Sequence, residues 1–575
     1  MSDTIITQRS ESAVESSRPF AGLLTGRRGR QIRESTLAYF FLFPAFLIIF
    51  IFGIFPLAFS AYESTLRGLN RIVGRYDGLG NYVNAIGNLA YVLGFWLAII
   101  LLFLAVRSVR RGVKTARTQE EQPWLLALPA VVLAGGFMLF LRFFYIFLPL
   151  LLGIADQMRE AQQAGEGQPG ELFRRFLVEN FLLPEVQGPF WLAVGVLAVG
   201  VTLSYLALRF TPPSRRNGTY FAAFFQGAIL FMLTAALSWF TWTEVQAAYA
   251  EAIEEGEELA IWSQMVTISV GLVLLILAWV VWDSANNRDS NRSTFLRLGA
   301  ASMLIVGGWV FIGELPQAAG SGDSDWYLGL LNTVYYSAGS IAVQLPVSLI
   351  LASFLFQNIH GKSVFRMIYF LPYITPTVGA AAVFRVLFSA RVDAPVNSLL
   401  TSLGFGSLQW LNEATGVVQL LVGEAVTLPE WAVGPSLALV VIIIFGIWSF
   451  IGFNTVIFLA GLGSIPSALY EAASIDGAGR WAQFRNVTLP LLSPTIYFLT
   501  LWAVIGTFKA FNHIYVLRTT AALGTVDTAS IVIFDAMKRD TRYGYAAALS
   551  MLLLLIVMVL TIVNNRIASR RVFYG

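Results

Sequence analysis

The chain has 575 residues, of which 57% are hydrophobic and only 13% are charged, and its formal net charge is +4. Soluble proteins carry roughly 25% charged residues, so this composition excludes a soluble fold and predicts an all-α, polytopic membrane protein in contact with a lipid bilayer. The absence of cysteine excludes disulfides and thiolate metal sites. The excess of basic residues is explained by the positive bias of cytoplasmic membrane loops, so no nucleic acid partner is expected.

The N-terminal segment predicts a tail followed by a membrane helix. Residues 1–35 contain many Arg, Ser and Thr and no apolar period, which is typical of a disordered, basic cytoplasmic tail. The first apolar run, about 37–62, is too long for a cleaved signal peptide and is predicted to span the membrane. Pro44 and Pro56 within it predict kinks.

Eleven further apolar runs bring the predicted number of transmembrane helices to about 12. They lie at about 89–106, 124–152, 189–209, 219–240, 262–282, 298–314, 329–357, 365–388, 435–462, 490–511 and 545–564. If the N-terminus is cytoplasmic, alternation places most basic loops inside, the acidic loop at about 241–260 outside, and the C-terminus inside. The sequence therefore predicts a multi-pass protein of the cell membrane with both termini in the cytoplasm.

A polar stretch at 464–490 interrupts the apolar runs and predicts a short helix, a turn and a second short helix. Pro466 suits the first turn of a helix, and Asp476-Gly477 supplies a stop that tolerates positive φ. Leu489-Pro490 is predicted to close the second helix. Trp481, Phe484 and Val487 recur at helical spacing, so they share one apolar face of this second helix. We therefore expect a docking element.

The order and spacing of three motifs in this stretch resemble the EAA loop of permease subunits of binding-protein-dependent ABC importers. The motifs are Glu471-Ala472-Ala473, Asp476-Gly477-Ala478 and Leu489-Pro490. The resemblance implies that the two helices sit in a groove of a separate ATPase subunit. It also implies a second permease subunit, an extracytoplasmic solute-binding protein and a prokaryotic inner or plasma membrane. ATP and Mg would bind to the ATPase, with no cofactor in this chain.

Two other segments are similar to the carbohydrate, maltose-type branch of these importers: residues 371–376 and 511–517. The chain departs from the branch pattern with Asn512 for Asp and Arg518 for Thr, and it lacks the usual Gly-Gly-Pro. The resemblance implies the core fold of a type I importer permease and covers about 36–87 and 326–575. We therefore interpret 36–87 as the first core helix with an external segment, 88–326 as an inserted six-helix block, and 327–575 as the core permease domain.

Polar and aromatic residues on the spans that flank the 464–490 loop are the candidates for a substrate path. Importers of this type place a transient substrate site near mid-membrane on these helices, and sugars bind to aromatic faces and hydrogen-bonding groups. Helix-to-helix hydrogen bonding explains each polar residue equally well. The candidates are Ser449, Phe450, Phe453, Asn454, Thr507, Phe508, Phe511 and Asn512, with Lys509 between them.

No catalytic or metal-binding residue is predicted. Gly361-Lys362-Ser363 is not a phosphate-binding loop, because Phe356 stands where the motif needs a glycine. His360 and His513 have no metal-ligand spacing. The prediction is thus a subunit that translocates a sugar or oligosaccharide, not an enzyme. The alternatives are a lipid-linked glycosyltransferase, which requires clustered acidic residues at a membrane boundary, and a secondary transporter, which requires repeated halves.

Overall fold

The computed structural model is almost entirely helical, which confirms the predicted all-α class. In the part of the chain that it describes, strands are limited to the antiparallel pair β1 (Leu66–Arg67) and β2 (Arg75–Tyr76). The described residues are 26–67, 75–121, 123–211, 216–256, 259–286, 291–357, 360–423, 426–428 and 432–571. The chain divides into two compact units, residues 1–61 and 62–575, which are described separately.

The first unit contains α1 (Gly26–Ile49), the π-turn η2 (Phe50–Ile54) and most of α2 (Phe55–Glu63). Because Pro56 has no N–H to continue the regular ladder, the neighbouring N–H of Phe55 bonds instead to the carbonyl of Phe50. Helix α1 begins at Gly26, so the prediction of a disordered tail over 1–35 is corrected for residues 26–35. Residues 1–25 lie outside the described residues.

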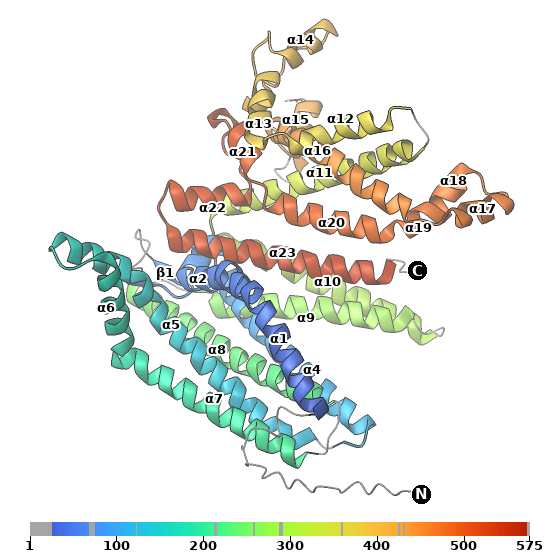
Figure 1. The fold of residues 1–575 in the computed structure, drawn as a ribbon. Coiled ribbons are helices and arrows are strands. Elements are labelled where there is room, and N and C mark those ends of the chain that lie inside the picture. The colour runs from blue at the N-terminus through green and yellow to red at the C-terminus, as the bar shows by residue number, and fades with distance from the viewer. Residues whose placement is uncertain are drawn as a thin grey trace, which may run out of the picture. The chain divides into compact units, whose positions relative to one another are not determined.

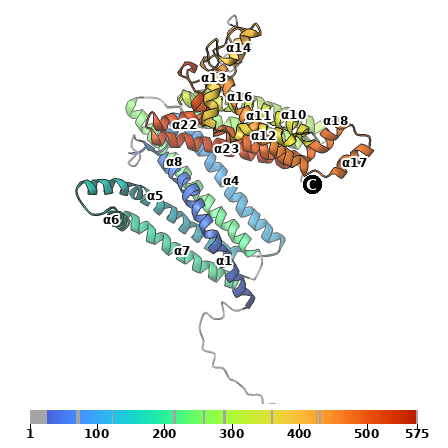
Figure 2. The same cartoon turned by 45° about the horizontal axis from the view of Figure 1, so that its top comes forward.

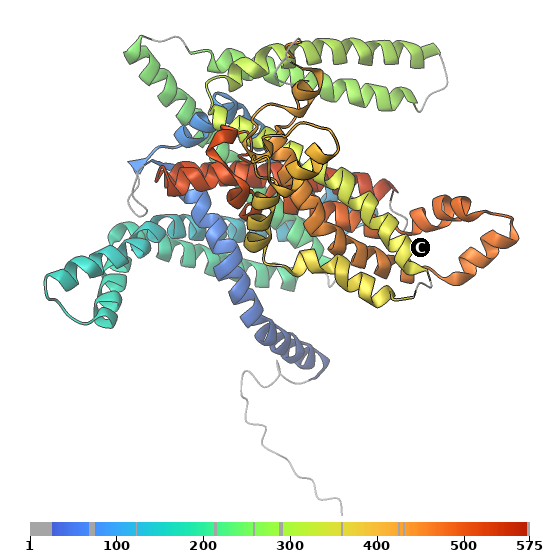
Figure 3. The same cartoon turned by 90° about the horizontal axis from the view of Figure 1, so that it is seen from above.

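Residues 88–326 form long helices that pair with one another. Helix α4 packs along α8, α5 along α7, and α9 along α10. Figure 2 shows α5, α6 and α7 together, and Figure 3 shows α9 and α10 in light green side by side. The elements are α4 (Leu89–Thr118), η3 (Pro123–Leu126), α5 (Ala127–Gln163), α6 (Pro169–Leu182), α7 (Pro184–Phe210), α8 (Asn217–Glu255), α9 (Ile261–Asn286) and α10 (Asn291–Ala319).

Two details of this region differ from or refine the sequence prediction. Helix α8 runs to Glu255, so most of the acidic segment predicted as a loop at about 241–260 is helical; residues 257–258 lie outside the described residues. Helix α5 is continuous through Arg142, so this arginine lies within a helix long enough to span a bilayer.

The remaining elements build the core of the second unit. Helix α11 packs along α16 and α20, and α12 lies on α16 (Figure 1). The elements are α3 (Gly80–Ile86), α11 (Ser324–Phe356), α12 (Lys362–Ile374), α13 (Thr377–Leu387), α14 (Pro395–Ser402), η4 (Trp410–Asn412), α15 (Val417–Val422), α16 (Leu437–Gly463), α17 (Ser467–Ile475), α18 (Arg480–Gln483), η6 (Phe484–Thr488), α19 (Leu489–Leu491), α20 (Ser493–Phe508), α21 (Asn512–Leu517), η7 (Thr520–Ala522), α22 (Ala529–Lys538) and α23 (Tyr543–Arg571).

The membrane-crossing helices match the predicted number. In the described residues, ten helices are long and apolar enough to cross a membrane, or up to twelve if two bent pairs each form one span. The span predicted at about 365–388 is broken in the middle, because α12 and α13 meet at 93°. Thr375 precedes Pro376, and a residue before proline avoids the helical region; its ψ of 134° is extended.

The second bent pair joins the 464–490 segment to a membrane helix. The helical stretch Arg480–Leu491 meets α20 at 62°. Pro494 cannot donate to the carbonyl of Pro490, and the hydroxyl of Ser493 donates to that carbonyl instead, at 2.6 Å. The sequence analysis expected Leu489-Pro490 to close the second short helix. The helix instead continues to Leu491, one residue beyond Pro490.

The two ends of the 88–326 region lie next to each other. The N–H of Asp323 donates to the carbonyl of Ala85 at 3.2 Å, and the hydroxyl of Tyr327 donates to the carbonyl of Ile86 at 3.1 Å. A Cβ on Gly322 would lie 3.0 Å from the backbone nitrogen of Gly87, so only glycine allows this close approach. The chain therefore leaves and re-enters the core at one point.

Candidate functional site

The 464–490 segment folds as a helix, a turn and a second helix, in the form that the sequence predicted. Helix α17 ends at Ile475, and the turn that follows requires Gly477, whose φ is +79°. The amide of Gln483 donates to the hydroxyl of Ser474 at 2.8 Å and to the carbonyl of Ala478 at 3.0 Å. These bonds hold the two helices in a fixed hairpin.

This hairpin leaves large apolar side chains in solvent. Ile475 is 86% exposed and Trp481 is 72% exposed, and the Trp481 ring stacks on Phe484 with centroids 5.6 Å apart. The motif residue Glu471 is exposed on α17. In Figure 1 the labels α17 and α18 lie beyond the end of α20, at the same end of the core as the last turn of α23. An exposed tryptophan on a rigid projection is typical of a protein-binding surface.

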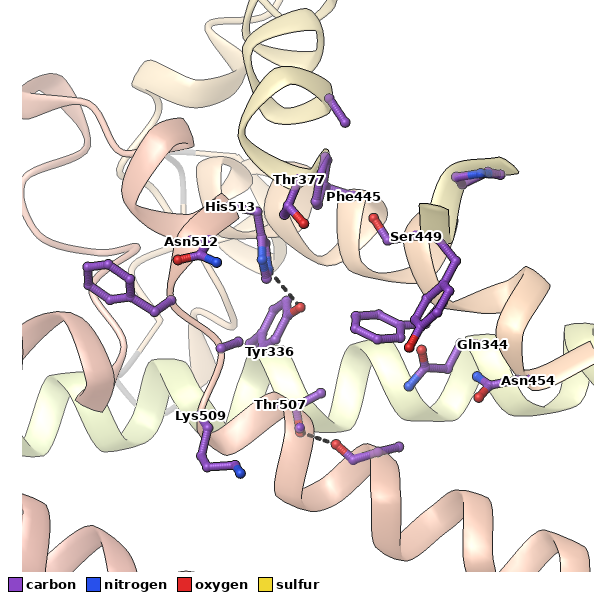
Figure 4. A pocket seen from close by; sticks show the side chains of 18 of the residues that line it. Tyr336, Gln344, Thr377, Phe445, Ser449, Asn454, Thr507, Lys509, Asn512 and His513 are labelled. Carbon is purple, nitrogen blue, oxygen red and sulfur yellow. Dashed lines mark hydrogen bonds between the residues drawn. The ribbon is translucent and has the colours of Figure 1, made fainter. Parts of the chain in front are cut away.

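A cavity of about 260 Å³ lies between α11, α16, α20, α21 and the break between α12 and α13 (Figure 4). Six tyrosine, phenylalanine and tryptophan rings line it: Tyr336, Tyr373, Phe445, Phe450, Trp502 and Phe511. The 93° bend brings Tyr373 and Thr377 to the cavity from two separate helices. This mixture of aromatic faces and polar groups matches the composition of small-molecule sites.

Six of the eight predicted substrate-path residues line the cavity: Ser449, Phe450, Asn454, Thr507, Phe511 and Asn512. The structure does not bring the other two there. Phe453 stacks on Tyr373, with ring centroids 4.8 Å apart, and is not part of the lining. Phe508 is buried in a separate apolar cluster with Trp326. Their place on the substrate path stays a prediction, which the lining of this cavity does not support.

The polar residues of the cavity differ in whether their hydrogen bonds are already formed. The hydroxyl of Thr507 bonds to that of Ser337 at 2.8 Å and also donates back to its own helix. By contrast, Nδ2 of Asn454 and Oε1 of Gln344 are buried without a hydrogen-bond partner in the described part of the chain. Buried amides normally find partners, so this pair is available to bind a ligand.

The sequence analysis missed several cavity residues on α11 and α12. Gln344 and Tyr336 lie on α11, and the hydroxyl of Tyr336 bonds to Nε2 of His513 at 2.8 Å. The signal for Gln344 was present, because it is a polar residue inside a long apolar run. Tyr336 carried no such signal, since tyrosine is common in membrane helices.

Arg518, one of the departures from the family pattern, organises a charged surface beyond the cavity. Its guanidinium bonds to Asp527 at 2.7 Å and to Asp535 at 2.8 Å. Burial raises the pKa of Asp527 to about 6, although Arg518 acts in the opposite direction. The two ion pairs fix the segment between α21 and α22, so Arg518 has a structural role here.

Comparison with known proteins identifies the family. Residues 344–572 match the family described as "Binding-protein-dependent transport system inner membrane component". The chain is 30% identical to the arabinooligosaccharides transport system permease protein AraP of Bacillus subtilis, covering 45% of this chain and 76% of that protein. It is also 30% identical to the lactose transport system permease protein LacF of Rhizobium radiobacter, covering 43% and 78%.

A more distant relative is the trehalose/maltose transport system permease protein MalF of Thermococcus litoralis, which is 28% identical and for which the match covers 43% of this chain and 75% of that protein. The chain belongs to the family of permease subunits of binding-protein-dependent ABC importers. It is accordingly a multi-pass membrane protein and a transport subunit.

Proposed function

We propose that this chain is one of two permease subunits that import a sugar or oligosaccharide across a prokaryotic cell membrane. AraP, LacF and MalF are each named for carbohydrate transport, and the aromatic and amide groups of the cavity are of the kind that bind sugars. An extracytoplasmic solute-binding protein would deliver the substrate. Two ATPase subunits would bind ATP and Mg and would dock on the 464–490 hairpin at the cytoplasmic face.

The observation that carries this proposal is the direct connection between the exposed hairpin and the cavity. The hairpin lies between α16 and α20, and both helices line the cavity. Because Arg480–Leu491 continues into α20 through one bend, a displacement of the hairpin displaces that wall. Closure of the ATPase pair would thus change the access to the cavity, as alternating access requires.

We also infer that residues 88–326 are an insertion that packs outside the translocation path. The adjacency of its ends supports this, and so does the position of the family match at 344–572, which lies wholly beyond the block. No residue of the block is among those that line the cavity. Glu244 on α8 ties the block to the core, since it accepts a hydrogen bond from the N–H of Leu79 at 3.0 Å.

The test is transport by the complex reconstituted with an ABC ATPase, a second permease subunit and a solute-binding protein. Glu471→Lys, Gly477→Pro and Trp481→Ala should each abolish ATP-driven uptake, because they alter the charge, turn and apolar surface of the hairpin. The permease should remain in the membrane. Trp239→Ala is the matched control, because Trp239 is also 72% exposed but lies on α8. Unchanged uptake and ATPase activity in all three hairpin variants would refute the proposal.

A further inference from the structure

The cavity has one fully charged residue and no opposite charge. Lys509 follows the end of α20 and lines the cavity, and the lining contains neither Asp nor Glu. The acidic residues nearest along the chain, Asp527 and Asp535, both pair with Arg518. In the part of the chain that the structure describes, Lys509 therefore forms no ion pair.

An ammonium group in this position needs either water or a counter-charge. Ionised side chains among membrane helices are expensive unless they face water or a counter-charge, and they usually mark a substrate path. Lys509 is exposed rather than buried, so it remains available to a ligand. A cavity with a net positive charge disfavours cations and favours an anionic group.

The two ends of the cavity differ in chemistry. Figure 4 shows Lys509 at one end and Gln344 with Asn454 at the other, with Tyr336 and Thr507 between them. The free Oε1 of Gln344 accepts a hydrogen bond and the free Nδ2 of Asn454 donates one. Such a pair matches the hydroxyl groups of a sugar, whereas the ammonium matches a carboxylate.

We propose that the substrate is an acidic carbohydrate, whose carboxylate binds to the ammonium group of Lys509 while its hydroxyl groups bind to Gln344 and Asn454. This proposal rests on the proposed function as a carbohydrate importer, and it specifies the class of sugar. Lys509 is then a specificity-determining residue, because a neutral sugar leaves its charge without a partner.

The experiment compares uptake of radiolabelled digalacturonate with uptake of α-1,4-galactobiose, which differs only in having CH₂OH in place of each carboxylate. The full complex is used in proteoliposomes. Wild-type protein should prefer digalacturonate. Lys509→Met should lower digalacturonate uptake about ten-fold to a hundred-fold without lowering galactobiose uptake, and Lys509→Arg should retain the preference. Lys114→Met, at an exposed position on α4, is the control and should change neither rate.

The outcomes separate this inference from the proposed function. Import of galactobiose or maltotriose without import of digalacturonate would overturn the acidic class while leaving the importer intact. An equal loss of both substrates in Lys509→Met, or failure of that variant to assemble, would assign Lys509 to structure or to the second permease and would also overturn it. If the wild-type complex imports none of the three sugars, the carbohydrate function itself fails.

Discussion

Replacement of Gly452 by alanine should separate the two helices that form one wall of the cavity. A Cβ at this position of α16 would lie 1.8 Å from the carbonyl oxygen of Tyr369 on α12, and real Cβ contacts essentially never fall below 3.0 Å. The carbonyl would have to retreat by at least about 1.2 Å. Since the clash is with backbone, helix α12 must move as a unit.

The expected magnitude follows from this displacement. Overpacking of a well-packed contact costs about 1 to 3 kcal/mol, and a backbone clash belongs at the upper end. Alanine regains roughly 0.5 to 1 kcal/mol of helix propensity, so a net loss of about 2 kcal/mol remains. The movement also carries Tyr373, which lines the cavity and stacks on Phe453. Uptake should therefore decrease together with stability.

The assay is the melting temperature of the purified permease in detergent, measured beside uptake in proteoliposomes. For a chain of 575 residues, a loss of about 2 kcal/mol should lower the melting temperature by roughly 2 °C. Gly463→Ala is the control, because it adds the same methyl group at the end of the same helix with nothing within 4 Å. If Gly452→Ala has the same melting temperature as Gly463→Ala and transports normally, the close contact between α12 and α16 is refuted.

Three further predictions test other parts of the molecule. Deleting the block between Gly87 and Gly322 and joining these glycines should lower the assembled yield and leave the substrate range unchanged; a changed range in a well-assembled complex would contradict this. Because the pKa of Asp527 is raised from 3.8 to about 6, folding favours its protonated form, and this stabilising contribution is lost as the pH rises from about 4 to about 6. Asp527→Asn should therefore remove a fall in melting temperature between about pH 4 and 6, and an unchanged slope would count against this. Ser449→Ala should weaken uptake about five-fold to a hundred-fold at constant stability. Thr507→Val leaves the buried hydroxyl of Ser337 unpaired and should cost about 1 to 3 kcal/mol in unfolding free energy. The reverse pattern would mean that Thr507 binds substrate and that Ser449 is structural.

The sequence was sufficient to predict features that depend on local patterns. Hydrophobic run length predicted the helices that cross the membrane, because the bilayer thickness sets the length of a spanning helix. Proline and glycine positions predicted the hairpin at 464–490, where Gly477 adopts positive φ. The break after Thr375 was also predictable, since Pro376 disfavours a helical conformation in the residue before it, but the apolar run continued through it and masked the signal.

The cavity could be predicted only in part, because it depends on which face of each helix turns inward. Phe450 and Phe453 lie three residues apart on α16, yet Phe450 lines the cavity and Phe453 is excluded from the lining while stacking on Tyr373. Similarly, the sequence could not show that Thr507 is already bonded to Ser337. Such choices depend on contacts between distant segments, which no local pattern encodes.

The two bent helix pairs would allow a displacement of the 464–490 hairpin to move the walls of the cavity, which straight helices would not. Two walls of the cavity, the break between α12 and α13 and helix α20, are each connected to a proline-induced bend. At the bend before α20, the hydroxyl of Ser493 donates to the carbonyl of Pro490, for which Pro494 has no N–H. At the bend between α12 and α13, the N–H and the hydroxyl of Thr375 both donate to the carbonyl of Leu371, and Pro376 has no N–H to continue the ladder. At each bend the proline makes no backbone hydrogen bond that a change of angle would have to break. The energy of hairpin displacement can therefore reach the cavity as a change of angle at Leu492, while α16 and α11 remain packed as the fixed walls.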